Sequence, residues 1–294
     1  MLIAITGATG FLGHYVVNCL LADGHRCRCW FRPTSDRDGF DDPSRIDWVP
    51  GHLNDSNTTS ALVQGADAVV HAAVHWGREG GVSAFADTNV VGSVRLMEQA
   101  KDAGAQRFVF IGTCAVHEVI LDDRTLDEAH PLWPTGHYGA CKAAVEKFVH
   151  SFGLGRGWGV CSLRPTGIYG LHRPAQRSKW FDLVAKVAAG EPIESAAGGK
   201  EVHAEDCAAA VSVLLQAPLE KIAGQAFNCY DHYVSEQAVA RIAAKLTGSG
   251  SRIADLNKGC RYEIDTSKIQ ALGMKFGGRA LLEKTVAQLV EAVA

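Results

Sequence analysis

Apolar and polar positions change along the 294-residue chain with two alternating periods. Short, continuously apolar runs indicate strands that are buried on both faces, and the segments between them repeat apolar residues at helical spacing. The runs that predict strands are Leu2–Thr6, His25–Phe31, Ile46–Pro50, Asp67–Ala73, Arg107–Gly112 and Gly159–Arg164. The segments that predict helices between them are Phe11–Ala22, Thr58–Val63, Ala84–Ala103 and Gly136–Phe152.

This alternation predicts an α/β fold, in which residues 1–166 form a doubly wound parallel sheet covered by helices. After Tyr169 the pattern is less regular. Helices are predicted there at Trp180–Ala189, Asp206–Gln216, Glu236–Leu246 and Leu281–Val293, with short extended pieces between them. We assign residues 167–294 mainly to a smaller mixed α/β lobe that binds substrate, and leave open whether some of its segments return to the main sheet.

Composition narrows the class of protein. Hydrophobic residues make up 47% and charged residues 21% of the chain, as in ordinary globular enzymes. The 29 basic and 32 acidic residues are interspersed and give a net charge of -3, so we expect neither a nucleic-acid nor a membrane partner. The first apolar run follows no basic segment and is interrupted by glycines, so we expect no signal peptide or membrane anchor.

The nine cysteines are scattered and form no CxxC pair, which predicts reduced thiols and a cytoplasmic protein. His71 and His75 are spaced like a helical zinc pair. They would leave a strand rather than lie on a helix, and no third ligand is near in sequence, so we expect no metal site.

Three glycines, Gly7, Gly10 and Gly13, join the first strand to the first helix. A strand, a glycine turn and a helix start place free N–H groups and the helix dipole at one point, which suits a pyrophosphate. The spacing is GxxGxxG rather than GxGxxG. By itself it is also compatible with a tight turn that binds no ligand.

Tyr138 and Lys142, in the stretch HYGACKAAVE, are four residues apart and therefore share one helix face. A nearby ammonium lowers the pKa of a phenol and makes it a usable acid or base. Thr113 comes just past a predicted central strand, where such sheets bind ligands. The alternative to a catalytic role is that Tyr138 and Lys142 merely line a helix surface and that Thr113 caps a loop.

Taken together, the motifs resemble the extended short-chain dehydrogenase/reductases, the group that includes the NAD-dependent epimerase/dehydratase family. The segments that carry the resemblance are TGATGFLG, VVHAA, TNVVGS, FIGTCAV, PTGHYGACKAAVE, LRPTGIYG and DTSKIQALGMKF, in this order. The resemblance implies a Rossmann-type domain, bound NAD(P) and a catalytic set of Thr113, Tyr138 and Lys142. It also implies a homodimer whose subunits pair through the two long helices predicted at Ala84–Ala103 and Gly136–Phe152.

The same resemblance implies which residues contact the cofactor. Gly7, Thr9, Gly10, Phe11, Leu12 and Gly13 would lie along the pyrophosphate; Leu53 would offer a backbone contact to adenine; Ala72, Ala73 and Val74 would border the cofactor; Pro165 and Thr166 would flank the nicotinamide. Asn89 would help to hold the active-site helix. Lys142, next to Tyr138, would bond the ribose hydroxyls.

Departures from the family pattern refine the cofactor and the reaction. Arg32 follows the second strand where an acidic residue would bond the free ribose hydroxyl of NAD, so we expect NADP rather than NAD. His52 replaces the aspartate that faces adenine. Thr113 is followed by Cys114 and Ala115 instead of an acidic pair, which sets dehydration aside.

The chain lacks two residues that sugar-nucleotide enzymes of the family commonly use to bind their substrate. Gly167 stands in place of an asparagine, and Lys200 stands in place of an arginine. His75, Trp76 and His117 are candidates for the walls of the substrate pocket, the alternative being loop residues packed on the surface.

We therefore predict an oxidoreductase that transfers a hydride reversibly between NADP(H) or NAD(H) and a secondary alcohol/ketone or an aldehyde. Tyr138 would be its acid/base. The alternatives are a sugar-nucleotide 4-epimerase that retains NAD, and a non-catalytic scaffold that senses a dinucleotide. The scaffold ranks last because Tyr138 and Lys142 are both present. No motif names the small-molecule substrate.

Overall fold

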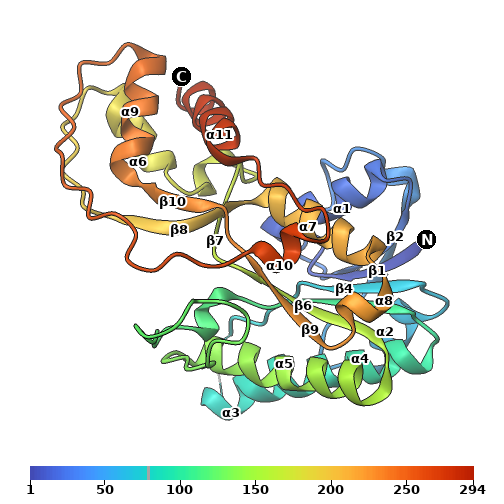
Figure 1. Ribbon diagram of the computed structural model, residues 1–294. Coiled ribbons are helices and arrows are strands. Elements are labelled where there is room, and N and C mark those ends of the chain that lie inside the picture. Colours follow the sequence, from blue (N-terminus) through green and yellow to red (C-terminus); the bar gives the residue numbers. More distant parts are fainter. Residues whose placement is uncertain (78–79) are drawn as a thin grey trace. The chain divides into compact units, whose positions relative to one another are not determined.

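The computed structural model describes residues 1–77 and 80–294, which form two compact units (Figure 1). Unit 1 contains Met1–Pro165, Cys207–Cys229 and Asp265–Met274, and unit 2 contains Thr166–Asp206, Tyr230–Ile264 and Lys275–Ala294. The chain therefore passes from unit 1 to unit 2 directly after Pro165.

Unit 1 is built on one sheet, in which every neighbouring pair of strands is parallel. Its strands are β1 (Leu2–Thr6), β2 (Arg26–Phe31), β3 (Ile46–Pro50), β4 (Ala68–His71), β5 (Arg107–Ile111), β6 (Gly159–Pro165) and β9 (Gln225–Cys229). Their order is β3-β2-β1-β4-β5-β6-β9. The order reverses direction beside β1, as in doubly wound sheets, so the expected fold class is confirmed.

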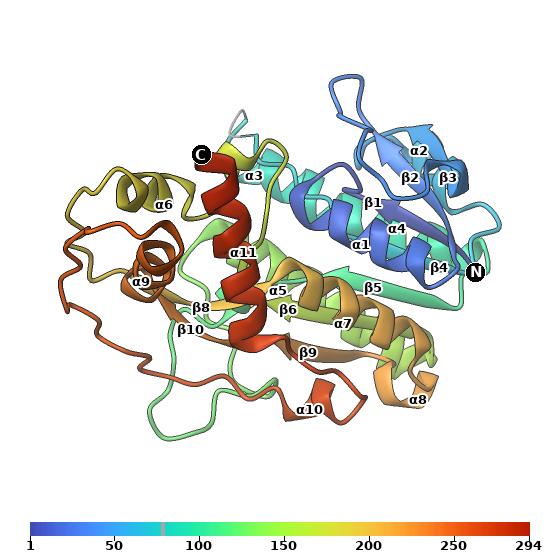
Figure 2. The same ribbon diagram turned by 90° about the horizontal axis from the view of Figure 1, so that it is seen from above.

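Helices cover both faces of this sheet. The helices of unit 1 are α1 (Phe11–Ala22), α2 (Ser56–Val63), α3 (Gly81–Ala86), α4 (Gly92–Asp102), α5 (His137–Arg156), α8 (Leu219–Ile222) and α10 (Ser267–Gln270), and α7 (Ala204–Gln216) belongs to it from Cys207 onward. Figures 1 and 2 show α1 and α7 on one face and α2, α4 and α5 on the other. Because both faces are covered, all seven residues of β6 are buried, which explains the continuous apolar runs.

The long helix expected over Ala84–Ala103 is present, but it contains a π turn. A π turn, η2 (Asp87–Val91), separates α3 from α4. Such turns occur mostly as single insertions, frequently at functional sites. This one carries Asn89.

Two segments from the C-terminal half of the chain lie in unit 1: Cys207–Cys229, with most of α7, α8 and β9, and Asp265–Met274, with α10. The strand β9 pairs with β6 at the edge of the main sheet, and α10 packs against β9. The question of whether C-terminal segments return to the sheet is thus answered for these two. The predicted role of the remaining lobe in substrate binding stays a prediction.

Unit 2 has a small mixed sheet of β7 (Gly167–Tyr169), β8 (Gly198–His203) and β10 (His232–Ser235), in which β8 lies between the other two. β10 is antiparallel and β7 is parallel to β8. Its helices α6 (Phe181–Ala188), α9 (Glu236–Thr247) and α11 (Gly278–Val293) pack on one another, and their apolar faces form a core with Tyr169 and Val234 of the sheet.

Candidate active site

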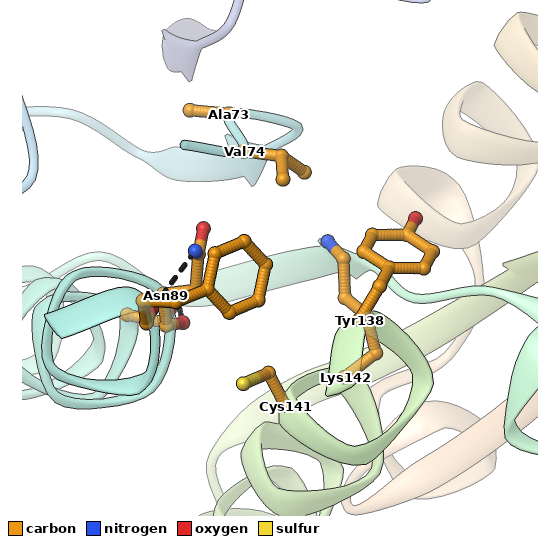
Figure 3. A pocket seen from close by; sticks show the side chains of 8 residues that line it. Ala73, Val74, Asn89, Tyr138, Cys141 and Lys142 are labelled. Carbon is orange, nitrogen blue, oxygen red and sulfur yellow. Dashed lines mark hydrogen bonds between the residues drawn. The ribbon is translucent and has the colours of Figure 1, made fainter. Parts of the chain in front are cut away.

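A pocket lies in unit 1, where segments that follow β4 meet η2, α4 and α5. Its lining residues are Ala73, Val74, Phe85, Asn89, Ser93, Tyr138, Cys141 and Lys142. Figure 3 shows Tyr138 and Lys142 rising side by side from α5 and facing Asn89, with Ala73 and Val74 on another side of the pocket. Because the carboxyl ends of parallel strands meet at one edge of the sheet, these side chains come together from distant parts of the chain.

The glycine turn adjoins this pocket through Ala73. Gly7 has a φ of +74°, and a Cβ on it would lie 2.7 Å from the backbone nitrogen of Ala73. A Cβ on Gly13 would overlap the backbone of Gly7, whereas a Cβ on Gly10 would meet only the Gly7 carbonyl oxygen, at 3.2 Å. The first and third glycines are therefore required by the packing of the turn itself, and Gly10 is the one that leaves the helix start open.

The start of α1 fits an anion. Gly10 is its N-cap residue and supplies no side-chain hydrogen bond to the first turn. The free N–H groups of such a start, together with the helix dipole, favour a negatively charged group. These residues therefore fit the diphosphate of a dinucleotide.

The turn after β2 is tied to the glycine turn. Thr9 Oγ1 donates to Ser35 Oγ (3.2 Å), and Ser35 Oγ also accepts the backbone N–H of Arg32 (3.0 Å). Arg32 is exposed. Nearby, Leu53 is buried against the glycine-bearing start of α4, since a Cβ on Gly92 would lie 3.0 Å from Leu53 Cβ.

Asn89 fastens the loop that follows β4. Its Oδ1 accepts the backbone N–H of His75 (2.9 Å), and its Nδ2 donates to the carbonyl oxygens of His75 and Phe85 (both 3.0 Å). The amide thus holds the loop by two hydrogen bonds to one residue. This position agrees with a residue that shapes the pocket wall, and its role stays a prediction.

A chain of buried neutral hydrogen bonds lies behind the pocket; we call it the His71 network (Thr6, His71, Ser93, the Ala73 N–H and the Asn89 carbonyl). His71 is 1% exposed, and its ring nitrogens contact Thr6 Oγ1 (2.6 Å) and Ser93 Oγ (2.8 Å). Thr6 Oγ1 also accepts the N–H of Ala73 (3.2 Å), and Ser93 Oγ donates to the Asn89 carbonyl oxygen (2.6 Å).

The directions of these bonds fix the histidine tautomer. Ser93 uses its proton on Asn89, so it accepts from His71 Nε2–H, and Nδ1 then accepts from the hydroxyl of Thr6. Burial, with a smaller contribution from Lys142, lowers the pKa of His71 to about 3. The imidazole is therefore neutral at physiological pH. Both of its ring nitrogens are engaged in this network.

Thr113 and Tyr138 are brought together as expected. Their side chains share a hydrogen bond, and Thr113 Oγ1 accepts the N–H of Ala115 (3.1 Å) at the start of η3 (Cys114–Val116). The indole of Trp76 stacks on the Tyr138 ring with centroids 4.9 Å apart and an interplanar angle of 29°. Burial raises the pKa of Tyr138, and the hydrogen bond from Thr113 opposes that rise.

The pKa of Tyr138 is raised rather than lowered, contrary to the expectation drawn from the neighbouring Lys142. Lys142 Nζ donates to the carbonyl oxygen of Ile111 (2.6 Å), and it lies 4.5 Å from the centroid of the Phe110 ring and 5.9 Å from that of Tyr138. The amine is directed at a strand end rather than at the phenolic oxygen. Burial lowers the pKa of Lys142 to about 7.

A second set of buried polar residues lies at the end of β6. We call it the Arg164 cluster; its members are Arg164, Glu146, His117 and the Glu128 carbonyl. Arg164 is 1% exposed. It pairs with both carboxylate oxygens of Glu146, donating from Nε to Oε2 at 2.9 Å and from Nη2 to Oε1. Its Nη1 donates to His117 Nε2 (3.0 Å) and to the Glu128 carbonyl oxygen (3.2 Å).

Charge pairing decides the protonation of this cluster. Burial alone would raise the pKa of Glu146, but the hydrogen bonds and charge of Arg164, with help from His150, outweigh it and hold the pKa at about 2. Burial, assisted by the Arg164 charge, lowers the pKa of His117 to about 4. The cluster therefore contains one guanidinium, one carboxylate and one neutral imidazole.

The three candidate substrate residues are placed differently. Trp76 is 65% exposed and covers the Tyr138 ring, while the side chain of His75 is exposed beside the Asn89 amide. His117 is buried, uses both ring nitrogens within the protein and is not among the pocket-lining residues. The sequence reasoning missed Phe85, Ser93 and Cys141 of the pocket; the four-residue spacing of Asn89 and Ser93 was the available signal.

Pro165 ends β6, and Thr166 is the first residue of unit 2. The next position, Gly167, is paired with Glu201 in the small sheet, and a Cβ on Gly167 would lie 2.5 Å from Glu201 Oε2. Glu201 is buried and forms an ion pair with Lys179. A carboxylate thus fills the space beside the residue that replaces the family's asparagine.

The family model of the NAD dependent epimerase/dehydratase family matches residues 3–229 of this chain. The chain therefore belongs to this family, a family of enzymes, and the resemblance drawn from its motifs is confirmed.

Three known proteins illustrate the relationship. The chain is 28% identical over 193 residues to a 3-beta-hydroxysteroid dehydrogenase of Mycolicibacterium neoaurum, a match that covers 62% of this chain and about half, 51%, of the relative. It is 28% identical over 292 residues to the low-salt glycan biosynthesis protein Agl12 of Haloferax volcanii, covering 92% of both chains. The structure of a UDP-glucose 4-epimerase from Thermotoga maritima superposes with a TM-score of 0.80 at 19% identity, covering 99% of this chain and 98% of that one. This last likeness shows the fold.

The sequence also led to expectations about the state of the cysteines, a metal site and a membrane segment. The nine cysteines are free thiols. Across residues 1–77 and 80–294, no group of three or more histidine, cysteine or acidic side chains is arranged to hold a metal ion. Within the same residues, no helix has the length and apolar character needed to cross a bilayer.

Proposed function

We propose that this protein is an NAD(P)-dependent oxidoreductase that transfers a hydride reversibly between a nicotinamide cofactor and a secondary alcohol/ketone or an aldehyde. The observation that carries the proposal is the hydrogen bond between Thr113 and Tyr138, beside the buried amine of Lys142. This pair lies at a pocket whose other wall, Ala73, touches the glycine turn. Membership of an NAD-dependent family supports the same chemistry.

The chain's own residues supply the proton and the stabilisation of charge. A bound nicotinamide supplies the hydride in the reductive direction. Tyr138 donates its phenolic proton to the substrate oxygen as negative charge develops there, and Thr113 donates a hydrogen bond to the same oxygen. Because burial raises the pKa of Tyr138, the phenol holds its proton at neutral pH, as an acid requires. Lys142 would bond the ribose hydroxyls.

Replacing Tyr138 by phenylalanine tests this assignment. Tyr138→Phe removes the proton donor and leaves the glycine turn intact, so we expect unchanged cofactor affinity and a loss of turnover of at least about 100-fold. Tyr233→Phe removes a hydroxyl from a half-buried tyrosine of β10 and serves as the control. Turnover of Tyr138→Phe close to that of the wild type would remove Tyr138 from the mechanism.

For the cofactor we propose NADP in preference to NAD. The exposed guanidinium of Arg32 follows β2, and the turn that it begins is bonded to Thr9 of the glycine turn. An arginine at this place accommodates a ribose 2′-phosphate. Titration with NADPH and NADH should show tighter binding of NADPH, and Arg32→Ala should remove the difference. Tighter NADH binding that survives Arg32→Ala would refute the preference.

The main alternative is a sugar-nucleotide 4-epimerase with retained NAD. The match to a glycan biosynthesis protein over 92% of both chains favours it, whereas the Glu201 carboxylate beside Gly167 disfavours a diphosphate there. An epimerase would release tightly held NAD on denaturation and consume no reduced cofactor. A dinucleotide-sensing scaffold would bind the cofactor and turn over neither carbonyl compounds nor sugar nucleotides.

The substrate-facing residues, the cellular compartment and the oligomeric state can also be proposed. Trp76 and His75 would border a small-molecule substrate, which the lobe after Pro165 would shape. The free thiols fit a reducing compartment such as the cytoplasm. We also propose a homodimer through α4 and α5, which a monomer mass in light scattering at working concentration would contradict.

A further inference from the structure

We propose that the Arg164 cluster positions Thr113 and Tyr138 relative to each other, with Arg164, Glu146 and His117 as positioning residues. The inference rests on the proposed function, since it assumes that the Thr113–Tyr138 pair acts on the substrate. One buried guanidinium, carried by the strand that ends at Pro165, contacts the helix that carries Tyr138 and the loop that follows Thr113.

The first contact is with the catalytic helix. Tyr138, Lys142 and Glu146 follow one another at four-residue intervals on α5, and so lie on one face of it. Arg164 holds both carboxylate oxygens of Glu146. A two-pronged pair of this kind restricts orientation as well as distance, because the guanidinium and the carboxylate are both planar. It therefore sets the rotation of α5 against β6.

The second contact is with the loop that carries Thr113. Four residues after Thr113, His117 Nε2 accepts from Arg164 Nη1 at 3.0 Å, and the same nitrogen of Arg164 donates to the Glu128 carbonyl oxygen at 3.2 Å. The short helix η3 connects Thr113 with His117. In addition, Cys114 Sγ donates to the carbonyl oxygen of Arg164 at 3.0 Å. The segment that follows Thr113 is thus fixed to Arg164 at two points.

The chemistry of His117 suits this role better than substrate contact. A guanidinium can only donate, so His117 Nε2 must accept, and Nδ1 carries the proton that it donates to the Pro131 carbonyl oxygen (3.2 Å). Both ring nitrogens are then used inside the protein. A residue that the sequence marks as a pocket wall is assigned instead to the support of the reacting pair.

The central experiment replaces the ion pair by apolar side chains. Removing both charges together avoids leaving one of them buried and unpaired, so Arg164→Met combined with Glu146→Leu should still fold. We expect cofactor affinity within about threefold of the wild type and a kcat lower by about 100-fold, the cost of a misplacement of roughly 1 Å. A folded double variant with the kcat of the wild type overturns the proposal.

A second pair of variants tests the loop contact alone and does not depend on the folding of the double variant. His117→Gln keeps an acceptor for Arg164, whereas His117→Leu does not, so the glutamine variant should recover most of the kcat that the leucine variant loses. His130→Leu is the comparison variant: His130 is equally buried in the same loop, packs its ring against that of His117 (centroids 5.3 Å apart) and bonds Leu121 and Pro131. Its loss therefore disturbs the loop while leaving the acceptor that His117 offers to Arg164. Equal kcat for the two His117 variants overturns the proposal.

Amide hydrogen exchange separates this inference from the proposed function. If the wild type turns over no carbonyl compound, the proposed function fails, and exchange of residues 113–117 still measures the positioning. We expect exchange there to be about tenfold faster in the double variant and in His117→Leu than in the wild type. Unchanged exchange in both variants shows that the cluster does not hold the Thr113 segment.

Discussion

The His71 network and the Arg164 cluster both satisfy buried polar groups, the first with neutral hydrogen bonds and the second with an ion pair. Each buries polar groups near the carboxyl end of a strand, β4 and β6, and each joins segments that border the pocket. The His71 network is neutral, and each of its hydroxyl and imidazole groups both donates and accepts. The Arg164 cluster contains two buried charges that compensate each other.

The difference concerns what happens when one member is lost. Removing a partner from a neutral chain leaves a polar group unsatisfied, which costs about 1–3 kcal/mol. Removing one charge from a buried ion pair leaves the other uncompensated, which costs about 3–5 kcal/mol. At the same depth of burial, the loss of one member should therefore destabilise the protein more in the Arg164 cluster than in the His71 network.

The largest effect should follow from Arg164→Met alone. The variant leaves Glu146 buried without its counter-ion, so we expect the free energy of unfolding to fall by about 3–5 kcal/mol in urea denaturation. Arg26→Met removes an ion-pair partner that is 63% exposed and should change stability by no more than about 1 kcal/mol. A loss of similar size in the two variants would contradict the comparison.

A smaller loss should follow from Ser93→Ala in the His71 network. The variant leaves the Nε2–H of His71 without an acceptor, and we expect the free energy of unfolding to fall by about 1–3 kcal/mol. Ser60→Ala, at an exposed position of α2, is the matched control and should have little effect. If Ser93→Ala costs as much as Arg164→Met, neutral and ionic networks are equally sensitive and the distinction fails.

The smallest effect is on the pH dependence of stability, and it separates the two regions by pH range. The pKa of His71 is lowered to about 3 in the folded state, so the unfolded chain takes up this proton first as pH falls below about 6.5. Stability is lost in that range by up to about 1.4 kcal/mol per pH unit. The pKa of Glu146 is lowered to about 2, so its stabilising contribution is lost only as pH falls below about 4.5.

Urea denaturation at pH 7, 6 and 5 measures this difference. Between pH 6 and 5, we expect His71→Gln to reduce the slope of the unfolding free energy against pH by the equivalent of about one bound proton. His117 should account for part of the slope that remains, because its pKa is also lowered. Glu146→Gln should leave the slope in this range unchanged. An unaltered slope in His71→Gln would show that His71 is protonated in the folded protein.

Much of the fold could be predicted from the sequence, because the signals are local. Continuous apolar runs gave the strands of the main sheet up to β6, and the glycine turn followed by an apolar helix gave the β1–α1 join. The π turn at Asn89 was not foreseen, because such a turn adds one residue to a continuous helix and changes its apolar pattern very little. Strand β9 was missed as a strand because only its pairing with β6 distinguishes it from other short extended pieces.

Five residues that the sequence marks line the pocket, Ala73, Val74, Asn89, Tyr138 and Lys142, but the geometry of the pocket was not foreseen. The spacing of Tyr138 and Lys142 placed them on one helix face, and the structure joins Tyr138 to Thr113. The direction of the Lys142 amine could not be predicted, because the Ile111 carbonyl that it contacts is 31 residues away. The roles of these residues, and the preference for NADP, stay predictions.

The sequence by itself determined which segments become strands and helices, which side chains share a helix face and which family the chain belongs to. The tertiary structure alone decided the partners of the buried polar groups: Thr6 and His71 are 65 residues apart, and His117 and Arg164 are 47 residues apart. Such hydrogen bonds depend on sheet register and on the packing of helices against strands, to which many residues contribute together. A local pattern of apolar and polar positions carries no record of them.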